Sequence, residues 1–207
     1  MTRVLLVEDS RITRRSIQQM IDFHPQFELV AAIENAANAE ILCLRGMVDL
    51  ILMDVCTANN ESGLEAAASI KRHYPKIKIV IMTSMPEYSF LKKAREVGCD
   101  SFWYKEYGDQ DLMEVCEQTM QGISVWPKET PSILVGLIDS RELTQREFDI
   151  LRELVKREKY EDIADGLGIT INTVKYHIKN LLQKTGYRTT MQLVVDVVEK
   201  QLILPNY

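Results

Sequence analysis

The stretch Leu50-Ile51-Leu52-Met53-Asp54, four apolar residues followed by a carboxylate, constrains the fold of this chain more than any other feature. A short apolar run without alternation predicts a strand buried on both faces, as in a parallel sheet covered by helices. Asp54 then lies at the carboxyl end of that strand. Taken alone, Asp54 also fits a turn or capping residue that simply ends the strand.

The surrounding sequence alternates predicted strands and helices. The predicted strands are 4–7, 27–33, 49–54, 77–82 and 101–104, and the helices between and after them are 11–23, 36–45, 63–74, 89–97 and 109–121. Five strands alternating with five helices indicate an α/β fold with a five-stranded, parallel, doubly wound sheet joined by right-handed crossovers. Ligands of such sheets bind at the carboxyl ends of the strands.

Polar residues stand at four of these strand ends: Glu8 and Asp9, Asp54, Thr83, and Lys105. We expect them to converge. Three clustered carboxylates favour a bound cation, and Mg²⁺ prefers oxygen ligands. Asp54 could then act as a nucleophile on phosphorus, with the Lys105 ammonium neutralising charge and Thr83 offering a hydroxyl group. Each residue alone has a structural alternative, such as helix capping or a solvated charge.

Composition narrows the class of protein. The chain has 207 residues, 46% of them hydrophobic, and no apolar run long enough to span a bilayer, so we expect a soluble cytoplasmic protein without a membrane partner. Its four cysteines are scattered and are expected to be reduced structural thiols. The net charge is −5, yet no acidic residue occurs from Gly166 to Val195, where Lys175, His177, Lys179, Lys184 and Arg188 fall.

That cationic segment contains a predicted helix-turn-helix. A short helix at 160–167 is followed by a turn at Gly168, and Thr170 caps a longer helix that ends near Lys184. The exposed face of this second helix is polar and basic, which suits contacts to phosphates and base edges. A last helix over 191–200, with apolar Leu193, Val194, Val197 and Val198, offers surface for a dimer contact. We predict domains at 1–121 and 141–207, with a linker over 122–140.

Residues 1–121 resemble the receiver domain of bacterial two-component response regulators, which is flavodoxin-like. The matching residues are Glu8-Asp9, Asp54, Thr83 in Ile-Met-Thr-Ser, and Lys105. The resemblance implies that a sensor histidine kinase phosphorylates Asp54, that the Cys56 backbone carbonyl is a further Mg²⁺ ligand, and that Phe102 is the aromatic switch. The stretch from Asp54 to Gly63 departs from the family, because it lacks a proline and is one residue longer. Metal affinity and phosphoryl lifetime therefore do not follow from the resemblance.

Residues 141–204 resemble the LuxR-type DNA-binding domain of NarL/FixJ regulators, through Leu143 to Glu147, Thr173 to Ile178 and Gly186 to Leu193. The resemblance implies base and phosphate contacts to double-stranded promoter DNA; the residues it assigns are Thr173, Lys175, Tyr176, His177 and Lys179. Tyr176 replaces a smaller residue that is usual in the family, so no target sequence follows.

The two resemblances together imply a transcription factor, not an enzyme, that is controlled by phosphorylation and forms a homodimer when activated. One alternative is an orphan regulator that binds DNA independently of phosphorylation. A second is a haloacid-dehalogenase-like phosphatase, which needs another aspartate two residues after the nucleophile. Cys56 occupies that position, which disfavours the phosphatase.

Overall fold

The computed structural model describes residues 1–44, 46–107, 110–156, 159–200 and 202–203. The chain divides into two compact units. The first comprises Met1–Ser84 and Ser89–Glu129, and the second comprises Met85–Tyr88 and Thr130–Tyr207. Each unit has a hydrophobic core of its own. The segment predicted as a linker is therefore shared between the two units.

The first unit is built on one five-stranded sheet with the strand order β2-β1-β3-β6-β7. All of its neighbouring strands are parallel, which confirms the predicted doubly wound topology. The strands are β1 (Thr2–Val7), β2 (Phe27–Ile33), β3 (Leu50–Asp54), β6 (Lys78–Thr83) and β7 (Ser101–Tyr104). β3 is the central strand, and every one of its residues is buried, as its unbroken apolar run predicts.

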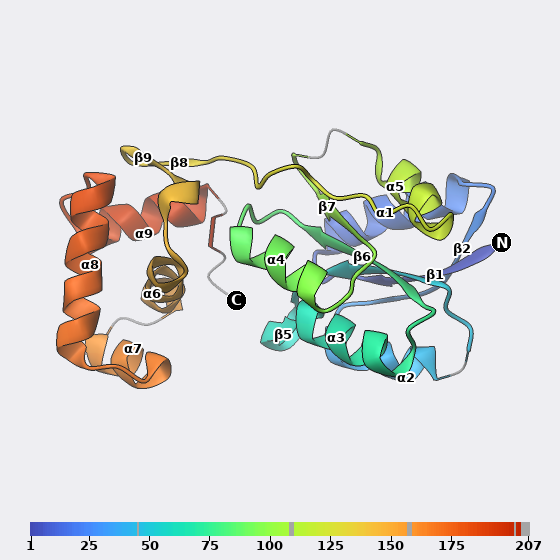
Figure 1. Ribbon diagram of the computed structural model, residues 1–207, viewed down its shortest axis with the longest axis horizontal. Helices are drawn as coiled ribbons and strands as arrows, with labels where there is room; N and C mark the ends of the chain where they lie inside the picture. Colours follow the sequence, from blue (N-terminus) through green and yellow to red (C-terminus); the bar gives the residue numbers. More distant parts are fainter. Residues whose placement is uncertain (45, 108–109, 157–158, 201, 204–207) are drawn as a thin grey trace. The chain divides into compact units, whose positions relative to one another are not determined.

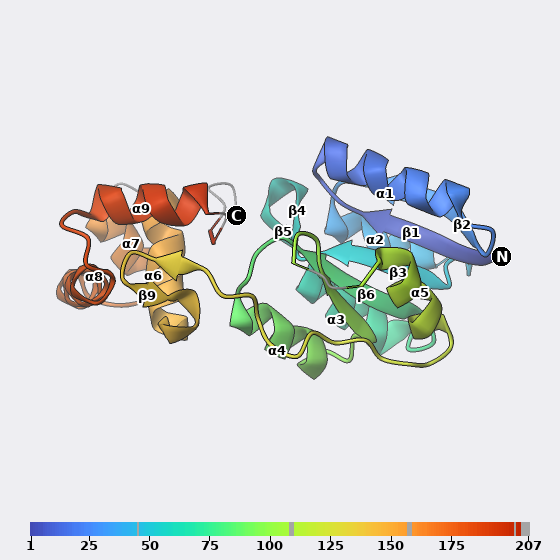
Figure 2. The same ribbon diagram turned by 90° about the horizontal axis from the view of Figure 1, so that it is seen from above.

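Helices cover both faces of this sheet (Figure 1). Seen in that view, α1 and α5 lie on one face, where their apolar residues join one core cluster, and α2, α3 and α4 lie on the other. Figure 2 shows β1, β3 and β6 side by side between these layers. The helices are α1 (Arg11–Phe23), η1 (Ala36–Asn38), α2 (Ala39–Cys43), α3 (Gly63–His73), α4 (Tyr88–Glu96) and α5 (Leu112–Met120).

The predicted helix over 36–45 was too long. Asn35 caps a single 3-10 turn, η1, and only Ala39–Cys43 is α-helical. The Asn35 side chain accepts the Ala37 N–H at 2.7 Å and also donates to the Ala58 carbonyl oxygen at 3.0 Å, so a local cap and a long-range contact together hold the start of η1. Parts of the prediction at residues 45 and 109 lie outside the described residues.

Asp100, just before β7, holds three elements of the first unit together. Its carboxylate accepts hydrogen bonds from the ammonium groups of Lys71 and Lys78 and from the backbone N–H of Ile79, the last at 2.9 Å. Partial burial alone would raise the pKa of Asp100, but these donors outweigh it and hold the pKa below its ordinary value. The ionised form therefore stabilises the fold.

We expect Asp100→Asn to lower the free energy of unfolding by about 2 kcal/mol, the scale of charged hydrogen bonds removed from a largely buried site. Because the folded-state pKa is depressed, this stabilisation is present at neutral pH and is lost as the pH falls through and below about 4. Urea unfolding at pH 7 and at pH 3.5 measures it. A gap between wild type and variant that is as large at pH 3.5 as at pH 7 would contradict the assignment.

The second unit is helical apart from a short hairpin. Its elements are β8 (Leu134–Val135), β9 (Ile138–Asp139), η3 (Ser140–Glu142), α6 (Gln145–Lys156), α7 (Tyr160–Leu167), α8 (Ile171–Thr185) and α9 (Thr190–Glu199). Thr144 and Glu147 form the predicted capping box at α6, with N···O distances of 2.7 and 3.3 Å. Gly168 ends α7 in the left-handed conformation and Thr170 caps α8, so the predicted helix-turn-helix is present.

Candidate functional site

The carboxyl ends of β1 and β3 bring together three acidic side chains. Glu8 and Asp9 follow β1, Asp54 ends β3, and one carboxylate oxygen from each lies within 4.8 Å of the others. Glu8 and Asp54 are buried, whereas Asp9 is exposed. Because β1 and β3 are neighbours in register, these strand ends meet at one edge of the sheet. These three side chains, called the acid pocket below, comprise two buried acids and one exposed acid.

Lys105 reaches this pocket from the edge of the sheet. It follows β7, and its ammonium group lies 2.8 Å from Asp54 Oδ2 and 2.6 Å from Glu8 Oε2. Its backbone N–H donates to the Thr83 carbonyl oxygen at 2.9 Å, which anchors the residue to the end of β6. Since β6 separates β7 from β3, the long lysine side chain spans one strand to meet the acids.

Burial and charge oppose each other within the pocket. Burial raises the pKa of Asp54, the Lys105 ammonium lowers it, and Glu8 raises it again, so that the pKa lies above its ordinary value. Burial lowers the pKa of Lys105, but Asp54 and Glu8 outweigh burial and the pKa is raised. Lys105 is therefore a fixed cation. One ammonium cannot balance three carboxylates, and this all-oxygen acid set fits a small, hard divalent cation.

The remaining predicted residues of this site lie on the adjoining strands. Thr83 is the buried last residue of β6 and directly follows Met82, the register partner of Asp54. Phe102 lies on β7 opposite Ile81, with 1% of its surface exposed. Cys56 begins β4 (Cys56–Thr57), two residues after Asp54. Thr83 thus lies at the same end of the sheet as the acids, the carboxyl end of the strands. Phe102 lies further from that end, within β7.

The long loop after Asp54 folds back on the strand that carries it. β4 pairs with β5 (Glu61–Ser62) around the 3-10 turn η2 (Ala58–Asn60), a hairpin that sequence analysis did not predict. The Gly63 N–H donates to the Val55 carbonyl oxygen at 2.9 Å. A Cβ atom on Gly63 would stand 1.8 Å from the backbone oxygen of Asp54. Gly63 therefore returns against the backbone of Asp54.

We expect Gly63→Ala to lower the free energy of unfolding by about 1–3 kcal/mol, because backbone and not a flexible side chain blocks the methyl group. Displacement of the Asp54 backbone should also move its carboxylate and thereby lower the rate of phosphorylation at Asp54. Thermal unfolding and phosphorylation assays measure both effects. Gly98→Ala is the control, since no atom lies within 4 Å of its Cβ position and any cost there comes from its positive φ of 82°. Equal phosphorylation in Gly63→Ala and wild type would contradict this role.

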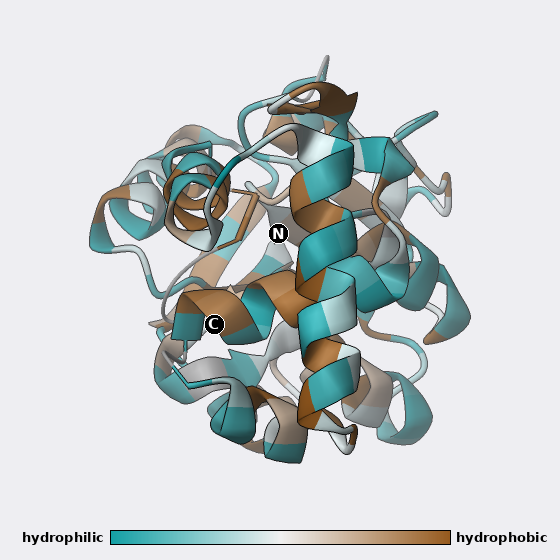
Figure 3. Ribbon diagram, turned by 90° about the vertical axis from the view of Figure 1, so that its left-hand side faces the viewer, coloured by the Kyte–Doolittle hydropathy of each residue, from teal (hydrophilic) through white to brown (hydrophobic). Residues whose placement is uncertain are grey.

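The proposed DNA-reading residues lie along α8. Lys175, Tyr176 and Lys179 are exposed, Tyr176 by 61%, while Thr173 and His177 are half-buried. The Tyr176 and His177 rings pack edge-on at 5.6 Å. Thr170 accepts the Thr173 N–H at 3.2 Å, which fixes the start of the helix. Figure 3 shows α8 with hydrophilic and hydrophobic segments alternating along its length, as expected for a helix buried on one side.

Lys184, part of the cationic segment, has a structural role instead. Its ammonium lies 3.0 Å from Glu147 Oε2 and also donates to the Glu142 carbonyl oxygen. Burial raises the pKa of Glu147, but hydrogen bonds from Thr144 and Lys184 outweigh it and lower the pKa. The end of α8 is further held where the Leu137 N–H donates to the Thr185 carbonyl oxygen at 2.9 Å. The β8–β9 hairpin that supplies Leu137 lacked a periodic signal in the sequence.

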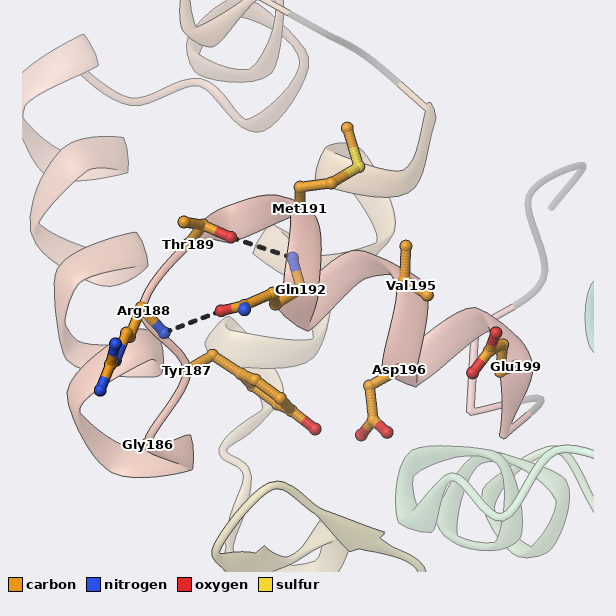
Figure 4. A pocket seen from close by; sticks show the side chains of 9 residues that line it. All are labelled: Gly186, Tyr187, Arg188, Thr189, Met191, Gln192, Val195, Asp196 and Glu199. Carbon is orange, nitrogen blue, oxygen red and sulfur yellow. Dashed lines mark hydrogen bonds between the residues drawn. The ribbon is translucent and has the colours of Figure 1, made fainter.

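A recess of about 610 Å³ lies along α9 and the turn that precedes it (Figure 4). Thr189 accepts the Gln192 N–H at 3.3 Å, and the Gln192 side chain accepts the Arg188 N–H at 3.2 Å. The lining residues are Gly186, Tyr187, Arg188, Thr189, Met191, Gln192, Val195, Asp196 and Glu199. Both basic and acidic residues are present in this lining.

The apolar residues of the last helix that were predicted to offer a dimer surface pack mostly in the core of the second unit. Leu193 and Val197 are buried, and Val194 and Val198 pack against the same core. The exposed apolar side chains of α9 are instead Met191, at 70%, and Val195, at 45%. Any apolar contact made by the outer face of this helix must therefore use those two residues.

This architecture defines a class of two-domain regulators, in which a signalling domain with an acid pocket is joined to a helix-turn-helix domain. Residues 4–117 match the family model of the response regulator receiver domain, and residues 141–197 match that of the LuxR family of bacterial regulatory proteins. The chain belongs to the DNA-binding response regulators of two-component systems, with a LuxR-type output domain. No helix among the described residues has the length and apolar character needed to cross a membrane.

Relatives match over nearly the whole chain. The response regulator protein VraR of Staphylococcus epidermidis is 30% identical over 97% of this chain and 98% of its own length. VraR of Staphylococcus aureus has the same identity and coverage. Among solved structures, a LuxR-family response regulator from Staphylococcus aureus covers 58% of this chain and 99% of its own, at 25% identity and a TM-score of 0.54. Salmonella typhimurium RcsB shares the fold, at 19% identity, a TM-score of 0.56, and 94% and 96% coverage.

Proposed function

We propose that this response regulator is a transcription factor whose DNA binding is controlled by phosphorylation of Asp54. A sensor histidine kinase is the proposed donor. The observation that carries the proposal is the placement of one buried ammonium, Lys105, between the carboxylates of Asp54 and Glu8, with Asp9 exposed beside them. This arrangement offers a nucleophile and a fixed cation at the carboxyl ends of the strands.

In the proposed reaction, an Asp54 carboxylate oxygen attacks phosphorus. The new O–P bond forms as the N–P bond of a phosphohistidine breaks, and the donor imidazole leaves with that electron pair. Lys105 neutralises charge on the transferring group, and the Thr83 hydroxyl donates to a phosphoryl oxygen. The side chains of Glu8, Asp9 and Asp54, with the Cys56 backbone carbonyl, would hold Mg²⁺. When bound, that ion neutralises charge on the phosphoryl oxygens.

In the proposed output, Phe102 changes position with Thr83 and thereby alters the surface near α4. Residues 1–121 would form the phosphoacceptor domain, 122–140 the linker, and 141–207 the DNA-binding domain. On α8, Lys175, Tyr176 and Lys179 would contact base edges and phosphates of double-stranded DNA, with Thr173 and His177 near the backbone.

Two observations support a DNA-binding homodimer. RcsB, another response regulator with the same fold, has been solved as two dimers bound to two parallel DNAs. Met191 and Val195 are exposed on α9 and offer an apolar surface. A dimer presents two α8 helices, one to each half-site of an operator.

The test is a gel-mobility shift on a DNA duplex selected by this protein from a random-sequence library. Wild type and Asp54→Asn are compared with and without acetyl phosphate and Mg²⁺. We expect acetyl phosphate to strengthen binding by wild type only. If both proteins bind equally under all conditions, the regulator acts independently of phosphorylation, which is the alternative function. Intact-mass measurement of the same samples reports whether Asp54 carries a phosphoryl group.

A further inference from the structure

The segment that follows α5 is bound to the edge of the sheet. The Val125 N–H donates to Ser101 Oγ at 3.0 Å, and the Val125 carbonyl oxygen accepts the Phe102 N–H at 2.9 Å. β7 is an edge strand of the sheet, so Val125 extends its hydrogen bonding by one residue. Figure 2 shows this segment passing beside α4 after it leaves α5. The start of the predicted linker therefore packs on the first unit.

The next residue, Trp126, packs on the proposed switch residue. Its ring stacks on that of Phe102, with centroids 6.3 Å apart and planes 28° apart. The Arg95 guanidinium of α4 lies 4.9 Å from the centre of the Trp126 ring. Phe102 also packs edge-on against Tyr104, with the ring centroids 5.0 Å apart. Trp126 thus touches both β7 and α4, and Phe102 owes part of its burial to a residue of the linker.

We propose that the stack Arg95–Trp126–Phe102 is a latch that holds the linker on the unphosphorylated first unit and releases it when Asp54 is phosphorylated. The inference rests on the proposed function. It extends that function by naming Trp126 as the linker residue that responds when Phe102 moves. No part of the proposed phosphoryl chemistry requires Trp126, which lies on neither the acid pocket nor α8.

The route from the pocket to the latch follows hydrogen bonds within the sheet. Lys105 donates its N–H to the Thr83 carbonyl oxygen, and Thr83 pairs in register with Tyr104, which packs on Phe102. A phosphoryl group on Asp54 would draw Thr83 and Lys105 toward it. The Phe102 ring would then turn toward the space that Thr83 leaves, and Trp126 would lose its stacking surface. The Val125 hydrogen bonds to Ser101 and Phe102 would then hold the linker without the aromatic stack, and its attachment to β7 would weaken.

The first experiment follows Trp126 by its fluorescence. The chain has two tryptophans, and Trp103→Phe leaves Trp126 as the sole emitter. Acrylamide quenching is measured with and without acetyl phosphate and Mg²⁺, and intact mass gives the phosphorylated fraction of each sample. We expect phosphorylation to raise the quenching constant about twofold, as Trp126 loses its aromatic partner. An unchanged constant in phosphorylated protein overturns the latch and leaves the proposed function standing.

The second experiment uses the reciprocity of coupled equilibria. If phosphorylation opens the latch, then removal of the latch must favour phosphorylation. Beryllium fluoride with Mg²⁺ binds reversibly in place of a phosphoryl group, so it gives such an equilibrium. Trp126→Leu should raise its binding constant roughly five- to seventyfold, the range set by one aromatic pair and one cation–π contact together. Arg95→Gln should give a smaller rise. Lys128→Ala, an exposed residue of the same segment, is the matched control and should match wild type.

The outcomes separate the latch from the proposed function. If wild type is phosphorylated and Trp126→Leu has no larger effect than Lys128→Ala, the latch is overturned and the proposed function stands. Wild type that takes up no phosphoryl group overturns both. Trp126→Phe keeps an aromatic ring, so it should retain much of the latch and guard against a folding defect. Thermal unfolding of each variant shows that it is folded.

Discussion

Lys105→Met should slow phosphoryl transfer from acetyl phosphate to Asp54 about 100-fold, the scale on which one preorganised charge acts in a transition state. Lys105 is the fixed cation of the pocket, with its ammonium 2.8 Å from Asp54 and 2.6 Å from Glu8. Methionine retains much of the side-chain volume but provides no charge and no N–H donor. The measurement is the initial rate of phosphorylation by intact mass, at saturating Mg²⁺.

Two variants make this result interpretable. Lys105→Arg keeps the charge but spreads it over a larger group, so it should recover part of the rate. Lys76→Met removes an exposed lysine from the turn before the amino end of β6, whereas Asp54 lies at the carboxyl ends of the strands. This variant should be phosphorylated at the rate of wild type. Thermal unfolding reports whether Glu8 and Asp54 tolerate the loss of their counter-ion. A Lys105→Met protein that is folded and phosphorylated at the normal rate would remove Lys105 from the proposed mechanism.

The double variant Lys175→Ala/Lys179→Ala should weaken DNA binding about 100-fold, from a loss of about 1.4 kcal/mol at each lysine. Both side chains are exposed on α8 within a stretch that has no acidic residue. Lysines that bind phosphates release counter-ions, so the slope of log K against log salt should become shallower by roughly 0.9 for each phosphate that the variant no longer neutralises. Fluorescence anisotropy with a labelled duplex at several salt concentrations measures both quantities.

The control for this variant removes the same charge from elsewhere. Lys128 and Lys156 are exposed outside α8, and the double replacement of both by alanine should change affinity much less. A Tyr176→Ala variant tests a different property, because a residue that touches base edges alters the preferred sequence more than the salt slope. Equal losses of affinity in the α8 and control variants would show that net charge, and not the face of α8, determines binding.

The sequence predicted the elements whose signals are local. The apolar runs of β1, β3, β6 and β7 marked strands buried on both faces, and each lies within a residue or two of its predicted bounds. Thr170, Thr189 and Gly168 marked the limits of α7, α8 and α9 because caps and left-handed positions depend on neighbouring backbone groups. Strand-end position also predicted which acids would meet, since the carboxyl ends of parallel strands share one edge.

The sequence did not predict elements that exist only through contacts made at a distance. β4, β5, β8 and β9 have two residues each, too few for any periodic pattern. The Asn35 side chain also donates to the Ala58 carbonyl oxygen at the start of η1, and no local signal marks that contact. The cationic segment is also less uniform than its composition indicates, because Lys184 is paired with Glu147.

The sequence by itself determined the two kinds of domain, the strand ends that carry the acids, and the polar face of α8, because each of these depends on residues close together along the chain. Only the tertiary structure decided that Gly63 packs on the Asp54 backbone, that Lys184 pairs with Glu147, and that Trp126 stacks on Phe102. These contacts join residues that are separated in the sequence and that the folded units bring together. Their partners become neighbours only after each unit has folded.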